Sequence, residues 1–142
     1  MVHFPHILIP IATDNDAHAT CAALQPYLDD VERVTAVHVI EKAGGSPDKA
    51  PLPKRREDAS KFLAIVDSSL STSVAVDTRT VFATDIVPAF FSTANDVGAD
   101  AIAFRPRGGS RIKQILAGDT ATKLVTNPSI PVIVLPDHGQ VA

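Results

Sequence analysis

A glycine-rich segment surrounded by positive charge is the part of this sequence best suited to binding an anion. Gly108, Gly109 and Ser110 follow one another, and successive backbone N–H groups in such a segment can form a nest for a phosphate or carboxylate oxygen. The cations around it are Arg105, Arg107, Arg111 and Lys113. A solvated charged loop is the alternative, and the residues leave both interpretations open. Because no set of aromatic residues accompanies these cations, they do not predict a nucleic-acid surface.

The histidines and the single cysteine do not form a metal or catalytic motif. His3 and His6 lie three residues apart, but in an extended segment they point to opposite faces, so we expect no metal site there. His38 falls inside a predicted strand and is expected to be a hydrogen-bonded core residue. Cys21 is expected to be a small core residue, and His18 to lie on the surface. Acidic residues and histidines do not converge with a nucleophile, so catalysis is the least favoured class.

Composition limits the protein to one domain, spanning residues 1–142. The 142 residues are 45% hydrophobic, which is enough for one core and too few for two domains of ordinary size. The net charge of -3 provides no overall field for nucleic acid or an anionic membrane. The N-terminus lacks the pattern of a signal peptide and no apolar run approaches a membrane span, so a cytoplasmic location is expected.

The elements that would position these residues alternate between strands and helices. Runs of β-branched and aliphatic residues predict strands over 7–11, 34–40, 74–82, 101–104 and 131–135. Helical spacing predicts helices over 17–28, 54–70, 85–97 and 112–125. Residues 41–53 are rich in Gly and Pro and predict an exposed loop. The third strand alternates in polarity, which places it nearer the edge of the sheet.

This alternation predicts a parallel sheet of five strands with helices on both faces, a three-layer α/β/α sandwich. In such sheets ligands bind beyond the carboxyl ends of the strands, near the point where the strand order reverses. The segments to inspect are therefore 12–16, 40–41, 83–85 and 105–119.

Four stretches of the chain resemble the universal stress protein family. After the fourth predicted strand, the family signature has a first glycine, a second three residues later, and a third ten residues beyond that, followed by Ser or Thr. Arg105, Gly108, Gly118 and Asp119 occupy those positions without a gap. The ending 127–134, with its proline-flanked last strand, and the strands around Ile7 and Val39 also match. The resemblance spans residues 7 to about 136 and implies the adenine nucleotide alpha hydrolase-like, Rossmann-like fold.

The same comparison shows three departures at the implied nucleotide site. Where nucleotide-binding members carry an Asp that hydrogen-bonds adenine, this chain has Ala12. Arg105 replaces the first glycine and is followed by Pro106, which has no N–H. Asp119 replaces the Ser or Thr that would face a phosphate, although it can also be a helix N-cap. We hypothesise that Arg105 pairs with Asp119 and closes the pocket.

The resemblance implies a dimeric stress-response or regulatory module that acts through protein contacts with an unidentified partner, without canonical ATP binding and with no cofactor expected. The last strand, with Val132, Ile133 and Val134, would pair with its twofold mate. The alternative is ATP or AMP binding. The motif-equivalent positions for a nucleotide are Ala12, Val39, Arg105, Gly108, Gly109, Ser110, Gly118, Asp119 and Thr120. A nucleotide-acting enzyme is a third, less favoured class.

Overall fold

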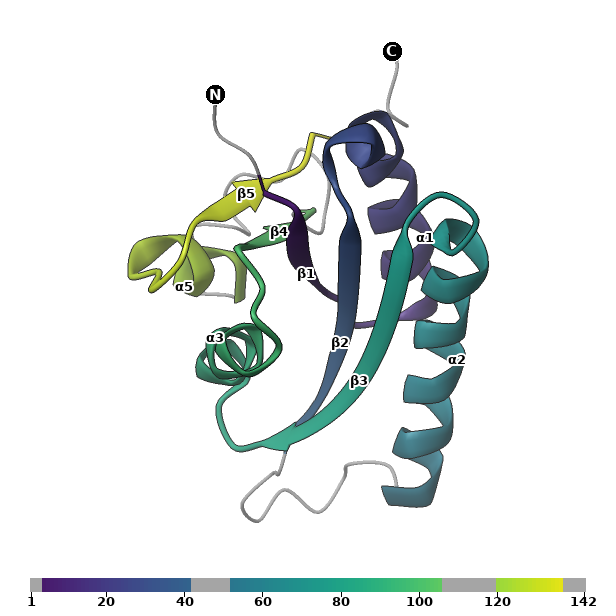
Figure 1. Ribbon diagram of the computed structural model, residues 1–142. Helices are drawn as coiled ribbons and strands as arrows, with labels where there is room; N and C mark the ends of the chain where they lie inside the picture. The colour runs from purple at the N-terminus through teal and green to yellow at the C-terminus, as the bar shows by residue number, and fades with distance from the viewer. Residues whose placement is uncertain (1–3, 42–51, 106–119, 137–142) are drawn as a thin grey trace.

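The structure is a computed structural model that describes residues 4–41, 52–105 and 120–136. Strands and helices alternate along the chain (Figure 1). In order they are β1 (His6–Pro10), α1 (Asp14–Leu24), the 3₁₀ helix η1 (Gln25–Asp30), β2 (Arg33–Glu41), α2 (Leu52–Leu70), β3 (Ala75–Ala83), α3 (Ile86–Val97), β4 (Ala101–Phe104), α5 (Thr120–Thr126) and β5 (Val132–Val134). The predicted α/β architecture is confirmed.

The five strands form one sheet in the order β3-β2-β1-β4-β5, and every pairing is parallel. β1 lies in the middle, with Ile7 opposite Val34 of β2 and Ala101 of β4. The chain builds outward from β1 to β3 on one side and then from β4 to β5 on the other. The strand order therefore reverses between β1 and β4, and β3 lies at an edge as predicted.

Two layers of apolar side chains hold helices against both faces of this sheet. Successive residues of a strand point to opposite faces, so Ile7 and Ile9 join the core beneath α1 and α2, whereas Leu8 joins the core beneath α3 and α5. All three side chains are fully buried. Figure 1 shows α1 and α2 on one side of the sheet and α3 and α5 on the other. The resulting sandwich has the three predicted layers.

The helix termini explain where the prediction and the structure differ. Helix 17–28 was expected, but α1 begins earlier because Thr13 is its N-cap and its hydroxyl accepts the N–H of Asp16. The α-helix ends at Leu24 and continues as the 3₁₀ helix η1, whose first turn contains Pro26. Proline has no N–H with which to continue the α-helical ladder. The prediction of a single α-helix over 17–28 is therefore wrong in its last turn.

The remaining boundaries differ by few residues. α2 begins at Leu52, so residues 52 and 53 belong to a helix and not to the expected 41–53 loop, while residues 42–51 lie outside the described part. α3 begins at Ile86, with Asp85 as its N-cap residue, and ends at Val97 as predicted, with Gly98 as its C-cap residue. Of the predicted helix 112–125, only the end is described, as α5. Among the described helices, none is long and apolar enough to cross a membrane.

Candidate functional site

Three of the predicted site residues lie on the side of the sheet where the carboxyl ends of β1, β2 and β4 meet. Ala12 lies two residues after β1, Val39 lies near the end of β2, and Arg105 directly follows β4. Since β1 lies between β2 and β4, these positions surround the point where the strand order reverses. Val39 is buried, while Ala12 and Arg105 are partly exposed. The structure therefore places these three positions at the carboxyl ends of neighbouring strands.

The other motif positions cannot be placed in the same way. Gly108, Gly109, Ser110, Gly118 and Asp119 lie outside the described residues, as do the cations at 107, 111 and 113. Thr120 is the first residue of α5, and its backbone is helical. The proposed ion pair between Arg105 and Asp119 therefore remains a hypothesis.

A buried carboxylate that the sequence interpretation did not single out organises the start of this site. Asp16 is 8% exposed. Its Oδ2 accepts the backbone N–H of Ala12 at 2.7 Å, and its Oδ1 accepts the hydroxyl of Thr20 at 3.3 Å. The N–H of Asp16 in turn donates to the Thr13 hydroxyl at 3.0 Å. This closely resembles a capping box, and the Thr-x-x-Asp spacing is the signal that could have identified it.

This arrangement determines what the Ala12 position can offer a ligand. The Ala12 side chain is a methyl group, which cannot accept a hydrogen bond, and its backbone N–H is already donated to Asp16. The Asp16 carboxylate lies at the N-terminus of α1, where the helix dipole favours a negative charge. It stabilises the turn between β1 and α1, and its two oxygens already accept hydrogen bonds.

His38 fixes the neighbouring ends of β1 and β2. Its Nδ1 lies 2.7 Å from the carbonyl oxygen of Ile11. A carbonyl oxygen only accepts, so Nδ1 carries the proton. The imidazole also packs edge-on against Phe62 of α2, with ring centroids 5.4 Å apart and an interplanar angle of 71°. His38 is therefore hydrogen-bonded as the sequence predicted, but it is only partly buried. It connects both strands to α2.

Two arginines near the start of α2 reach the ends of β2 and β3, and the sequence did not single them out as site residues. Arg55 donates through Nη2 to the carbonyl oxygen of Glu41, the last residue of β2. The Arg56 guanidinium carbon lies 5.1 Å from the centroid of the Phe82 ring on β3, within the range of a cation–π contact. Both cations therefore bind the start of α2 to the sheet.

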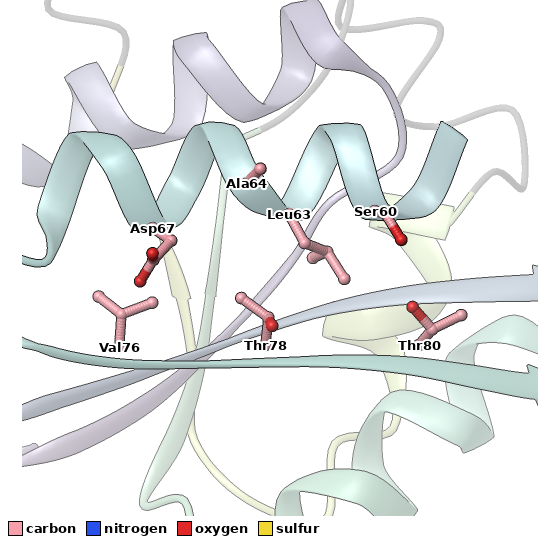
Figure 2. Close-up of a pocket in the computed structure, with 7 residues that line it drawn as sticks. All are labelled: Ser60, Leu63, Ala64, Asp67, Val76, Thr78 and Thr80. Carbon is pink, nitrogen blue, oxygen red and sulfur yellow. The ribbon is translucent and has the colours of Figure 1, made fainter. Parts of the chain in front are cut away.

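A cavity of about 380 Å³ lies away from these strand ends, between α2 and β3. Figure 2 shows side chains of α2 facing those of β3 across it. Its lining consists of Ser60, Leu63, Ala64, Asp67, Val76, Thr78 and Thr80. None of these residues belongs to the motif positions, so the sequence did not predict this groove. Within the described ranges, no group of three or more His, Cys, Asp or Glu side chains is arranged to hold a metal ion.

Comparison with known proteins matches this fold to one family. The chain is similar to the hypothetical protein MJ0577, with 22% identity over 95% of this chain and 97% of that one and a TM-score of 0.73. It is also similar to an Arabidopsis thaliana universal stress protein family protein with AMP bound, at 12% identity, 96% and 95% coverage and a TM-score of 0.63. A universal stress protein from Archaeoglobus fulgidus in complex with dAMP shares 20% identity, with 95% and 99% coverage and a TM-score of 0.53.

These identities are low and establish the shared fold. A search of curated proteins finds no match to the chain. The model of the universal stress protein family, in contrast, matches residues 3–136, which is nearly the whole length. The resemblance inferred from the signature spacing and the order of the strands is thereby confirmed, and the chain belongs to the universal stress protein family.

Proposed function

We propose that this chain is a dimeric regulatory module of the stress response that acts through protein contacts and does not bind ATP in the canonical way. The observation that carries the proposal is the absence of a side-chain hydrogen-bond acceptor at Ala12. An adenine amino group needs an acceptor, and Ala12 provides a methyl group and an N–H that Asp16 already accepts. Asp16 itself is buried and holds two donors. Adenine therefore has no acceptor side chain at this position.

Features of β5 support the dimer. β5 lies at one edge of the sheet and, among the described strands, pairs only with β4. Val134 on this strand is 50% exposed, and Val125 on the adjacent α5 is 45% exposed. Exposed large apolar side chains beside an unpaired strand edge favour association with another chain. We propose that β5 pairs with its twofold mate through Val132, Ile133 and Val134.

Nucleotide binding is the second candidate function. Solved structures of similar fold contain AMP, dAMP and, in one universal stress protein, cAMP. Val39 and Arg105 lie near the carboxyl ends of β2 and β4, on the same side of the sheet as Ala12. In this alternative the glycine segment holds the phosphates. Arg105 then supplies a contact in place of those lost where the chain departs from the family motif.

Thermal unfolding with ATP, ADP and AMP separates the two candidates. A ligand at about a hundred times its dissociation constant stabilises the folded state by about 2.7 kcal/mol, which raises Tm by roughly 10 °C for a chain of this size. We expect no shift for the wild type. The control is a triple variant that restores the motif, Ala12→Asp, Arg105→Gly and Asp119→Ser, which we expect to gain a shift. A wild-type shift of several degrees would show that the nucleotide alternative is correct.

A further inference from the structure

The outer edge of β3 has a set of backbone groups that face away from the sheet. The N–H of Ala75 donates to the carbonyl oxygen of Glu32 at 3.3 Å, and the β2 pairing continues in register to Ala83. In a parallel pair, residues bonded to the neighbour alternate with residues whose groups point away. Because Ala75 is bonded to β2, the outward residues are Val76, Thr78, Thr80 and Phe82. We call these four residues the β3 edge.

This edge is long and open along the described part of the chain. β3 has nine residues, and β2 is its neighbour on one side only. The groove between α2 and β3 lies beside it, and three residues of the edge, Val76, Thr78 and Thr80, line the groove (Figure 2). An unpaired strand of this length is a template for another strand, which proteins usually block with charged side chains.

The charges on β3 are self-complementary in one register. Asp77 and Arg79 flank Thr78 and, by the alternation of the strand, lie on the face opposite α2. Consider two copies of β3 paired antiparallel about a twofold axis through Thr78. Thr78 then lies opposite its own copy, and Asp77 of each chain lies opposite Arg79 of the other. Residues that already bond to β2 form the non-hydrogen-bonded pairs, in which side chains approach most closely.

Other registers lack this match. An axis through Arg79 places the two arginines directly opposite each other, which is unfavourable. An axis through Thr80 places Arg79 opposite Val81 and Asp77 opposite Ala83, so that neither charge is paired. Asp77 already contacts Arg33 of β2 at 2.7 Å, but its side chain is 52% exposed and a carboxylate can accept from two cations.

From these observations we propose that the β3 edge binds a second copy of this chain, antiparallel and centred on Thr78. The two sheets then become one continuous sheet across the twofold axis, and two pairs of opposite charges select the register. This surface lies at the opposite edge of the sheet from β5, so the inference goes beyond the proposed function and can fail or hold independently of it.

Cysteine cross-linking tests the register directly. In a Cys21→Ala background, Thr78→Cys would place two thiols at positions about 5.5 Å apart between Cα atoms, inside the range of a disulfide. The matched control is Thr80→Cys, on the same face and also exposed. Its two copies would lie about 13 Å apart along the strands. We expect Thr78→Cys to form disulfide-linked dimers on a denaturing gel at least about ten times faster than Thr80→Cys. Equal rates, or no cross-link in either variant, would overturn the proposal.

Charge reversal in the Thr78→Cys background provides a second test. Arg79→Asp alone places a carboxylate opposite Asp77 of the other copy, and Asp77→Lys alone places a cation opposite Arg79. Each variant should therefore slow cross-linking at least about tenfold at low salt. Mixing the two variants restores both opposite-charge pairs and should yield mixed dimers at near the original rate. Val134→Lys at the other edge should leave the cross-link unchanged. Charge variants that cross-link like the parent would instead indicate random collision and would contradict the assigned register.

Discussion

Single side chains stabilise the turns that follow the strands of this protein, and Asp16 is the clearest example. Its carboxylate holds the Ala12 N–H and the Thr20 hydroxyl while almost completely buried. The sequence marked 12–16 as a segment beyond a strand end, but it did not show which of these side chains would turn inward. That choice depends on the packing of α1 against the sheet, which places Thr20 and Asp16 on its buried side.

We therefore expect Asp16→Ala to reduce the free energy of unfolding by about 2 kcal/mol, because it leaves the N–H of Ala12 without its acceptor. Asp14→Ala is the matched control, since Asp14 is an exposed acidic residue in the same first turn. It should cost less than about 0.5 kcal/mol. Urea unfolding of both variants measures the difference. Equal losses would show that helix-dipole charge, and not the buried hydrogen bonds, is what matters.

His6 should make stability depend on pH. Its Nε2 lies 2.7 Å from the hydroxyl of Thr35. Burial, assisted by the charge of Arg33, lowers the pKa of His6 below 6.5. The unfolded chain therefore binds the proton more readily than the folded one. Stability should be complete above pH 6.5 and should decrease as the pH falls from there through the lower pKa of the folded state.

His6→Gln should reduce this acid-dependent loss. His18→Gln, which changes an exposed histidine, should leave it intact. Urea midpoints measured between pH 5 and pH 8 provide the readout. A stronger loss toward low pH in His6→Gln than in the wild type would mean that the pKa is shifted in the opposite direction.

At the scale of elements, the strands were predicted more accurately than the helix termini. The fourth strand has the predicted bounds, 101–104, and the other four differ from prediction by one residue at each end. Buried β-branched runs determine strands directly. Helix ends depend on local chemistry such as the cap at Thr13 and the proline at position 26, which compete with the apolar pattern. The predicted end of the third helix at residue 97 is correct. Gly98 follows the last turn, where a left-handed residue often ends a helix.

Gly98 has φ = +77°, and the N–H of the following Ala99 donates to the carbonyl oxygen of Ala94 at 2.9 Å. A Cβ added at Gly98 would meet no atom within 4 Å. Gly98→Ala should therefore destabilise the protein by about 1 kcal/mol through backbone strain and without a steric clash. Gly98→Asn should cost less, since Asn tolerates this conformation. Thermal unfolding compares the two. If the alanine variant is as stable as the wild type, the left-handed backbone of Gly98 does not disfavour a side chain.

For the whole molecule, the sequence predicted the layers and the number of strands, but the complete strand order and the registers come from the structure. The polarity of β3 indicated an edge, whereas the groove beside it depends on how α2 packs. Of the candidate site, Ala12, Val39 and Arg105 lie at the carboxyl ends of three neighbouring strands. The contacts of Arg55 and Arg56 with β2 and β3 are tertiary, and no spacing in one sequence reveals them. The contacts of Asp16 are local, and the Thr-x-x-Asp spacing could have indicated them.

The β5 dimer can be tested at this scale. Val134→Lys adds a charge to an exposed strand residue, so it should leave the fold stable while weakening pairing between β5 strands. We expect light scattering to show a shift from dimer toward monomer. Leu52→Lys is the matched control, because Leu52 is 43% exposed and lies at the start of α2. A wild type that is monomeric at all concentrations would contradict the dimer.

The sheet order places β3 and β5 at its two ends, so the two proposed pairings together would let each molecule bind two others. Pairing at one end alone is saturated when two copies have met. With pairing at both ends, every added copy presents a fresh end, so the mean length of the chain of copies rises continuously with protein concentration. Because neighbouring strands are rotated by roughly 20–25°, such a polymer would wind as a helix. Capping either end would convert it to particles of fixed size.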